Sequence, residues 1–439
     1  MFHKKLKYKI SEGDFFYKNC SKFFFSFVSF NVIFSLLTFE SSYFILFMKE
    51  IGFSKASIGI ILSLFPLCGV FAPLYLNFIS IFGLKKSFII GYFLRKFVFI
   101  LIIFTPVISI NFGSKLSFYY FLILIFLFCI LRAYAETAAL PWQQFFIPNQ
   151  IRGKISSISN TIVLITAIIV ILISSIIMGK NFDLQNYNSI VIFACVSGLV
   201  GVMFMTKVPN EKIYNFKFRK NSSRDYVNAL KNKNFIIYLT GSSLIALATT
   251  PILGFVPLFL VEIVEIQTGS SIKYDLFLLV GSSLSSLVFM NIIDKVKSKK
   301  LILSFIYINL IVPLLWFLTS YYQFINLYLF YFLYFLQGFS SCIIILVSNK
   351  ICFNNIIPKS NSAEYSSIYY ACVGLFGGLS PFIIGQIFDM LSNPYEVIFL
   401  YSFIFFISAS YFFFKLNYES RQDYQGNVID DNIVRRVST

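Results

Sequence analysis

Residues 117–140 read SFYYFLILIFLFCILRAYAETAAL, a run that is apolar except for the two charges Arg132 and Glu136. About 20 helical residues are needed to cross the ~30 Å hydrocarbon core of a bilayer. Transmembrane strands would instead give segments of roughly ten residues with alternating hydrophobicity. Because this run is continuous and long, it predicts a membrane-spanning helix that carries an internal pair of opposite charges.

The composition of the whole chain agrees with this prediction. Of the 439 residues, 58% are hydrophobic and only 13% are charged, and the mean hydropathy is +0.79. Soluble globular domains carry about 25% charged residues. These values exclude a soluble enzyme, a disordered chain, a collagen-like fibre and a disulfide scaffold. What remains is a polytopic membrane protein.

Apolar runs of similar length recur on both sides of the quoted stretch. They predict twelve spanning helices, an all-α membrane fold. The runs cover about 23–48, 56–80, 87–110, 117–145, 155–178, 189–206, 234–260, 272–292, 301–320, 323–348, 364–388 and 395–415.

The basic residues give the orientation. The chain has 36 Lys and Arg against 19 Asp and Glu, a net charge of +17. With both ends placed in the cytoplasm, 28 of the 36 fall in inner segments and 5 in outer loops. Cytoplasmic loops of membrane proteins collect Lys and Arg in this way. We therefore expect a multi-pass protein of the inner (plasma) membrane, and we expect no nucleic-acid partner because the charge is dispersed.

The residue types that enzymes need are scarce. The only histidine is His3, and the seven cysteines are scattered without a CxxC spacing. The sequence has no Walker A motif, which argues against an ATP-driven pump. We therefore expect no metal, no cofactor and no enzymatic activity.

The chain divides into two similar halves. Ile147-Pro148 lies between the fourth and fifth runs, and Ile357-Pro358 lies 210 residues later between the tenth and eleventh. We expect a six-helix bundle over 1–206, a basic linker over 207–233, a second six-helix bundle over 234–415 and a polar tail over 416–439. Two six-span halves of this kind are a transporter architecture.

Short motifs near the ends of the runs make the chain resemble the major facilitator superfamily over nearly its whole length. That family carries G-x-x-x-D-R-x-G-R-R after its second span and a weaker copy after its eighth. The first copy here departs from the pattern at Leu76 and Ser80. The residues that match these and two further family motifs are Gly83, Lys85 and Lys86; Asp294, Lys295, Lys299 and Lys300; Pro148, Arg152 and Gly153; and Gly385 and Asp389. The resemblance implies two pseudo-symmetric six-helix bundles and a gating role for these residues.

Charges within the runs are the best functional lead, since a charge at the bilayer centre is costly without a partner or a water-filled cavity. Glu40 lies in the first run, and Arg132 and Glu136 lie on one face of the fourth. By the resemblance, these runs line the central cavity. One interpretation is that Arg132 attracts an anionic or hydroxyl-rich substrate while a glutamate exchanges a proton. The other is a structural pair that satisfies only itself.

Four other residues, Gln337, Arg95, Lys96 and Trp142, have a polar or charged group within or near the runs. Gln337 is either a substrate hydrogen-bonder or a polar contact between helices. Arg95 and Lys96 are expected to extend along their helix to the inner membrane interface rather than to bind substrate. Trp142 is expected to be an aromatic anchor at the membrane surface.

We therefore predict a monomeric secondary transporter that lies in the lipid bilayer and moves a small solute by alternating access, with a proton as the candidate coupling ion. A drug or metabolite exporter of the same fold is one alternative. A non-transporting sensor or scaffold is another, but the polar ends are short for a signalling domain. Substrate identity and transport direction stay open.

Overall fold

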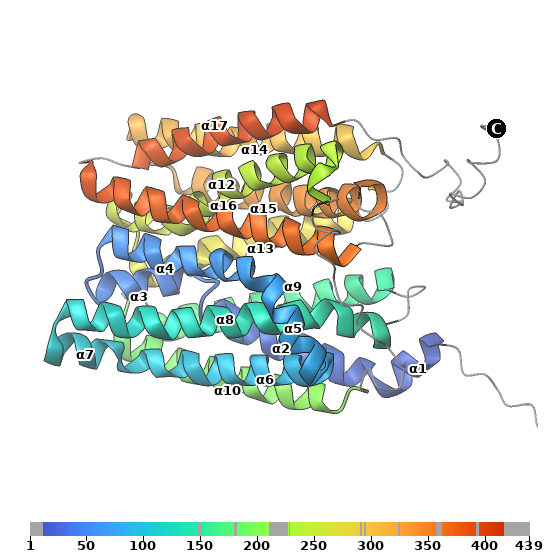
Figure 1. Ribbon diagram of the computed structural model, residues 1–439. Helices are drawn as coiled ribbons and strands as arrows, with labels where there is room; N and C mark the ends of the chain where they lie inside the picture. Colours follow the sequence, from blue (N-terminus) through green and yellow to red (C-terminus); the bar gives the residue numbers. More distant parts are fainter. Residues whose placement is uncertain are drawn as a thin grey trace, which may run out of the picture.

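The structure is a computed structural model, and it describes residues 12–147, 152–179, 182–209, 227, 229–289, 292–293, 296–323, 325–356, 362–391 and 395–416. Within these ranges all regular structure is helical (Figure 1). Eleven apolar helical stretches are long enough to cross a membrane, and the shorter stretch Lys55–Phe71 continues into a further helix. The twelve predicted spans are thus confirmed as helices.

The first six spans form the N-terminal bundle, which lies in the lower part of Figure 1. Several of these spans consist of two consecutive helices. The elements are α1 (Glu12–Asn19), α2 (Ser21–Leu37), α3 (Ser42–Glu50), α4 (Lys55–Leu67), η1 (Cys68–Phe71), α5 (Ala72–Phe82), α6 (Leu84–Ile100), η2 (Leu101–Phe104), α7 (Thr105–Phe112), α8 (Ser114–Phe146), α9 (Arg152–Met178) and α10 (Leu184–Thr206).

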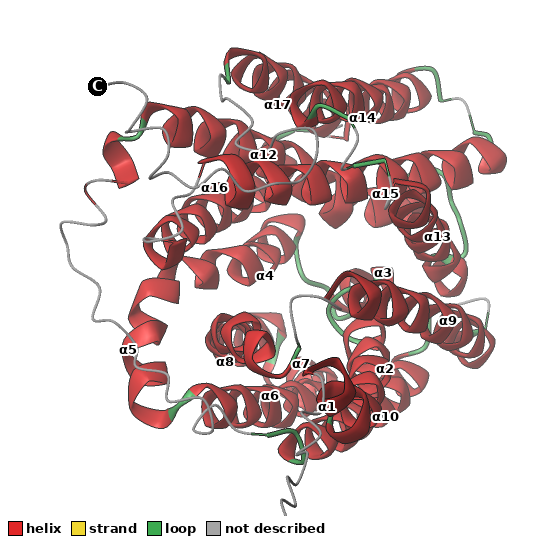
Figure 2. Cartoon of the chain, turned by 90° about the vertical axis from the view of Figure 1, so that its right-hand side faces the viewer, coloured by secondary structure: helices red, strands yellow, loops and turns green. Residues whose placement is uncertain are grey.

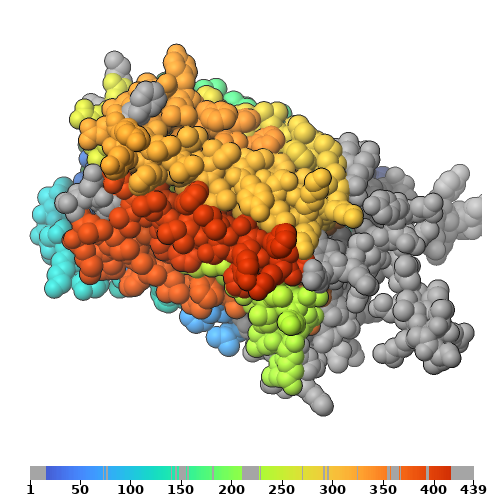
Figure 3. Space-filling model, turned by 90° about the horizontal axis from the view of Figure 1, so that it is seen from above, coloured from blue at the N-terminus to red at the C-terminus, as the bar shows by residue number. Residues whose placement is uncertain are grey.

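The other six spans form the C-terminal bundle, which lies above the first in Figure 1. Its elements are α12 (Lys233–Glu262), η5 (Thr268–Ser270), α13 (Ile272–Phe289), α14 (Ser298–Tyr321), α15 (Leu327–Lys350), the π-helical turn η6 (Ile351–Ile356), α16 (Ser362–Met390) and α17 (Tyr395–Lys415). In the space-filling view, α17 (red) crosses one outer face of this bundle beside the yellow and orange helices (Figure 3).

The spans run roughly parallel, so the molecule has two ends. We call the right-hand end of Figure 1, where α1 lies and α17 finishes, the terminal end, and we call the opposite end the far end. The two bundles meet along two helix pairs, α4 with α16 and α9 with α13. Figure 2, seen from the terminal end, shows the two bundles as separate groups of helices.

Glycines bring α4 and α16 into backbone contact. A Cβ atom added at Gly59 would overlap the carbonyl oxygen of Pro381 and the backbone of Gly385. A Cβ at Gly374 would similarly overlap the carbonyl of Pro66. Small residues permit such close approach between membrane helices, where packing rather than the hydrophobic effect drives association. This seam therefore holds the two bundles in register.

The first span is broken near its middle. The prediction for residues 23–48 was a single run, but α2 ends at Leu37 and α3 begins at Ser42. The Thr38 hydroxyl donates back to the carbonyl of Phe34, 2.5 Å away, and the amide of Glu40 donates to the carbonyl of Ser35 at 3.1 Å. Non-helical backbone at membrane depth is tolerated where it is buried in protein or lines a cavity.

Trp142 is not exposed to lipid, as an aromatic anchor at the membrane surface would be. Its side chain is fully buried, and its indole N–H donates to the carbonyl of Pro209 at 3.2 Å. Its ring packs against Phe88 and Phe146. An indole needs one polar partner, and the end of α10 supplies it inside the bundle.

Candidate functional site: a polar cavity between the two bundles

A cavity of about 430 Å³ lies between the bundles. Ligand pockets commonly have volumes of ~300–1,000 Å³ and mainly apolar walls with a few polar groups. Both bundles contribute to its walls, which are mostly apolar. Besides the aromatic residues Trp316 and Tyr334, the polar residues among the lining are Glu40, Ser41, Ser42, Arg132, Thr250, Asp275 and Gln337.

Arg132 reaches the cavity from α8. Its Nε lies 2.9 Å from Oε1 of Glu136, one helical turn further along. The guanidinium carbon lies 4.8 Å from the ring centroid of Phe39, which also lines the cavity. The predicted i,i+4 pair is therefore formed, and aromatic faces hold the rest of the cation.

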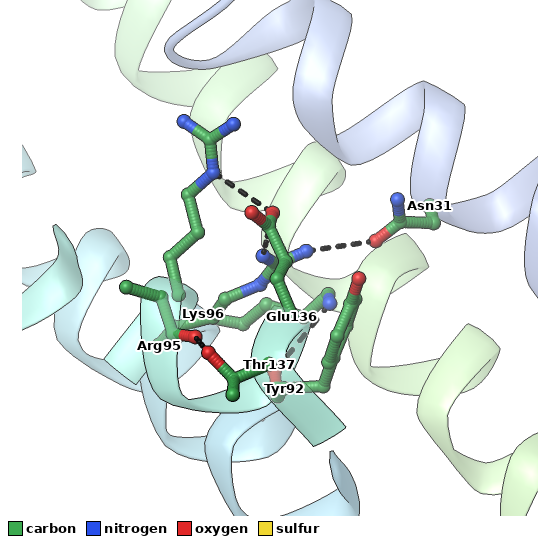
Figure 4. A network of polar contacts seen from close by, with 8 residues as sticks. Asn31, Tyr92, Arg95, Lys96, Glu136 and Thr137 are labelled. Carbon is green, nitrogen blue, oxygen red and sulfur yellow. Dashed lines mark hydrogen bonds and ion pairs between the residues drawn. The ribbon is translucent and has the colours of Figure 1, made fainter. Parts of the chain in front are cut away.

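Glu136 serves two arginines at once. Its Oε1 atom also lies 3.5 Å from an Nη of Arg95 on α6, as Figure 4 shows. The other Nη of Arg95 donates to Oδ1 of Asn31 on α2 at 3.0 Å. Glu136 itself is not among the residues that line the cavity, although its side chain is 46% exposed. One carboxylate thus joins α6, α8 and, through Arg95, α2.

The expectation that Arg95 and Lys96 extend to the inner interface is wrong. Their exposed fractions are 1% and 0%. The guanidinium of Arg95 lies 3.8 Å from the ring centroid of Tyr92, and Lys96 Nζ lies 4.7 Å from the centroids of both Tyr92 and Phe34. These partners compensate the cations inside the bundle. The side chains therefore have no need to reach the membrane surface.

The charges of this cluster do not balance. Arg95, Lys96 and Arg132 are three cations, and Glu136 is the one carboxylate within ion-pair distance of any of them among the described residues. Glu40 lies in the break of the first span with an exposed side chain, and no ion pair to Glu40 is formed among the described residues. The N-terminal bundle therefore presents one cation, Arg132, and one acid, Glu40, to the cavity, while Arg95 and Lys96 are buried behind this wall.

Gln337 on α15 forms part of the opposite wall. Its Nε2 donates to the hydroxyl of Ser341 at 3.1 Å, while the buried Oε1 has no protein partner. The next turn holds a second polar contact, in which the Ser340 hydroxyl donates to Oδ1 of Asn309 at 2.9 Å. A buried acceptor beside a cavity is suited to bind a donor group of a ligand.

A carboxylate that the sequence analysis did not single out also lines the cavity. Asp275 lies in the first turn of α13, and its two oxygens accept from Ser42, one from the backbone N–H and one from the hydroxyl, each at 2.9 Å. Ser42 begins α3, so an acid of one bundle caps a half-helix of the other. An acid inside the eighth apolar run was the signal that identifies this residue.

Further polar contacts join the bundles at the far end. Glu262, the last residue of α12, lies 2.7 Å from Lys55 and 3.6 Å from Lys49, and it accepts from the Tyr395 hydroxyl at 2.7 Å. The amide of Phe182 donates to the hydroxyl of Thr268 in η5 at 2.8 Å. The sequence analysis did not identify Glu262, because it lies at the boundary of a run.

The structure describes only some of the residues expected to act in gating. Gly83 joins α5 to α6 with φ at +86°, a conformation that favours glycine. Lys85 donates to the carbonyls of Thr206 and Val208 at the end of α10. Lys86 is exposed at the start of α6, and Asp389 is exposed near the end of α16. Arg152 and Gly153 begin α9, and their burial is outside the described part. Asp294 and Lys295 lie outside the described residues.

A known family of membrane proteins matches this chain. The family model described as Major Facilitator Superfamily matches residues 23–323 and 276–427. The chain belongs to the Major Facilitator Superfamily. The resemblance inferred from the short motifs is therefore confirmed, and the chain is a multi-pass membrane protein with a transporter fold.

Solved structures of this superfamily share the fold at low identity. A D-xylose–proton symporter gives a TM-score of 0.69 at 14% identity, covering 93% of this chain and 98% of its own. A point mutant of the nucleoside transporter NupG gives 0.67 at 15%, covering 90% and 98%. A bacterial homologue of the iron transporter ferroportin, in an inward-facing state, gives 0.66 at 11%, covering 90% and 96%. No curated protein matches the sequence.

Proposed function

We propose that this protein is a secondary transporter that moves a small polar solute across the membrane by alternating access. The observation that carries the proposal is the cavity shared by the two bundles, with Arg132 and Glu40 on one wall and Gln337 on the other. Rocking of one bundle against the other around such a site exposes it to each side in turn. The solved relatives, titled as sugar and nucleoside transporters, support transport as the activity.

Arg132 is the cavity group that favours a solute with an anionic or hydroxyl-rich group. It is half-buried at the cavity and shares its partner Glu136 with Arg95, so its guanidinium can pair with a further acceptor, while Glu40 lines the same cavity without an ion pair among the described residues. A solute carboxylate or phosphate that bonds to Arg132 would compete with Glu136. A glutamate released in this way is free to take up a proton, which would link binding to proton movement. Glu40 is the second candidate for this role.

The polar contacts between the bundles at the far end indicate which side of the membrane the cavity is closed to. Glu262 with Lys49 and Lys55, and Phe182 with Thr268, join the bundles at the far end. With the termini in the cytoplasm of the plasma membrane, as the distribution of Lys and Arg favours, the far end is extracellular. The structure would then represent a state whose cavity is closed to the outside. The protein would act as a monomer in the bilayer.

A ligand screen followed by transport tests the proposal. The purified protein is heated with sugars, nucleosides, amino acids, carboxylates, phosphates and lipophilic cations. A ligand at ~100-fold its Kd stabilises the folded state by ~2.7 kcal/mol. We expect a polar hit that is lost in Arg132→Ala, is kept in the control Asp183→Asn at the exposed N-cap of α10, and is accumulated by proteoliposomes.

Other outcomes separate the alternatives. Accumulation that persists in Glu40→Gln with Glu136→Gln would refute coupling through these glutamates. The mostly apolar cavity lining also suits an exporter of apolar compounds. Stabilisation by lipophilic cations, with no response to polar solutes, would favour that exporter over the proposal.

A further inference from the structure

The contact between Asp275 and Ser42 joins the bundles at the wall of the cavity. Asp275 belongs to α13 in the C-terminal bundle, and Ser42 is the first residue of α3 in the N-terminal bundle. Any separation of the bundles at the far end must break both of its hydrogen bonds. The state of this carboxylate is therefore tied to the conformational change that the proposed function requires.

No cation is paired with Asp275 among the described residues. No ion pair to this carboxylate is formed within the described part of the chain, and Ile45, Leu278 and Leu279 lie beside it in the cavity lining. Ionisation in such a place is costly unless hydrogen bonds offset the lost hydration. The two bonds from Ser42 provide a partial offset, aided by the positive end of the α3 dipole.

The titratable groups around Asp275 are few. Tyr43 on α3 and Tyr334 on α15 interact with it electrostatically, and both are buried. On its own helix, Tyr274 is buried and Lys273 is exposed. The titratable residues of α9, which packs along α13, are Arg152 and Lys154 near the terminal end, and on α12 the nearest acid is Glu262 at the far end. From the N-terminal bundle, Glu40 and Arg132 line the same cavity, and neither forms an ion pair with Asp275. No group around Asp275 therefore supplies a paired cation.

We propose that Asp275 is a proton-binding residue that couples proton binding to the position of the two bundles, an inference that rests on the proposed transport function. Protonation places a hydrogen on a carboxylate oxygen and removes the uncompensated charge, while the other oxygen still accepts from the Ser42 amide. The protonated form thus favours the far-closed state. Opening the far end hydrates the carboxylate, so the ionised form favours the open state, and the proton leaves to water.

Proton linkage fixes the sign of the effect. The far-closed state binds the proton more tightly, so lowering the pH should populate it and raising the pH should populate the far-open state. A single titrating group changes the ratio of two states by at most about tenfold per pH unit. This response needs no solute, which separates it from the transport activity itself.

Distances between spin labels in lipid nanodiscs measure this linkage. The far-end pair is Lys115→Cys with Tyr322→Cys, and the terminal-end pair is Lys86→Cys with Lys300→Cys, all at exposed positions in different bundles. The full chain is used, with Cys342→Ser and Cys372→Ser because these two cysteines are not fully buried. Between pH 5 and pH 9 we expect the far-end distance to lengthen and the terminal-end distance to shorten.

Matched variants assign the response to Asp275. Asp275→Asn mimics the protonated form in size and hydrogen bonding, so its far end should stay closed at every pH. Ser42→Ala removes the hydroxyl donor and keeps the acid. The far-open fraction at pH 9 should therefore rise by roughly threefold or more, an increase that the loss of one hydrogen bond to a charged group can produce. Asp183→Asn, an exposed far-end acid, should keep the response.

Three outcomes would overturn the inference. The first is a response of normal size in Asp275→Asn, and the second is opening of the far end by acid. The third is a response that requires Na⁺ at constant pH, since the site would then bind a metal cation. If neither label pair ever moves, with any pH or ligand, the alternating-access function itself fails, which is a different result.

Discussion

At the scale of single residues, the cation cluster of the N-terminal bundle is the least ordinary feature of the chain. Arg95 and Lys96 are buried within a membrane-spanning helix pair, where a charge requires a partner or a cavity. Glu136 supplies the partner for Arg95 and for Arg132 at the same time. This sharing makes Glu136 a structural residue as well as a candidate for proton exchange.

Replacing Glu136 should therefore lower stability as well as alter transport. In Glu136→Gln, both guanidinium groups lose their carboxylate, and we expect a loss of about 1–3 kcal/mol, the cost of leaving a buried polar group without its partner. Glu40→Gln is the matched control, because no ion pair to Glu40 is formed in the described residues. Thermal unfolding in detergent measures the stability of both variants. Equal unfolding temperatures would show that Glu136 does not stabilise the fold.

The same residues show what the sequence could and could not predict. The i,i+4 spacing of Arg132 and Glu136 predicted their ion pair, because helix geometry alone brings them together. The burial of Arg95 depends on Asn31 and Tyr92, which come from tertiary contacts and from its own helix. Glu262 escaped prediction because its partners lie on other elements.

At the scale of helices, the twelve spans were predictable from hydropathy, but the break in the first span was not. Residues 38–41 include three polar side chains, but polar residues also occur within unbroken helices, and the Asp275 contact that caps α3 comes from a distant segment. The α4–α16 seam depends likewise on tertiary structure, since a glycine in sequence does not reveal which backbone it faces.

The seam gives a prediction at this scale. Gly59→Ala places a methyl group on the backbone of Pro381 and Gly385, and overpacking of this kind costs about 1–3 kcal/mol. Gly377→Ala on the same α16 is the control, because its Cβ would meet neighbours at 3.5 Å or more. We expect a lower unfolding temperature in Gly59→Ala alone. A similar loss in both variants would mean that helix propensity, not the seam, sets the effect.

At the scale of the whole molecule, the two bundles are joined by contacts of different kinds. Along α4 and α16 the contact is backbone packing, which does not respond to ionic conditions. At the far end it is electrostatic, because Glu262 holds Lys49 and Lys55 with side chains that are 23–30% exposed. In the proposed alternating-access cycle, the seam would serve as a pivot while the far-end ion pairs form and break.

This division predicts how the far end responds to charge changes. Glu262→Gln removes both ion pairs, and because exposed pairs contribute ~0.2–1 kcal/mol each, the ratio of far-open to far-closed states should rise by roughly two- to thirtyfold. High salt should produce a similar rise in the unmodified protein and almost none in the variant, since screening acts on charges already removed. The label pair at Lys115 and Tyr322 measures the effect of the variant and the effect of salt.

The double exchange Lys55→Glu with Glu262→Lys should restore much of the closed population, because it rebuilds one ion pair with reversed polarity. If salt opens the far end of Glu262→Gln as much as that of the unmodified protein, the seam rather than the charges controls closure.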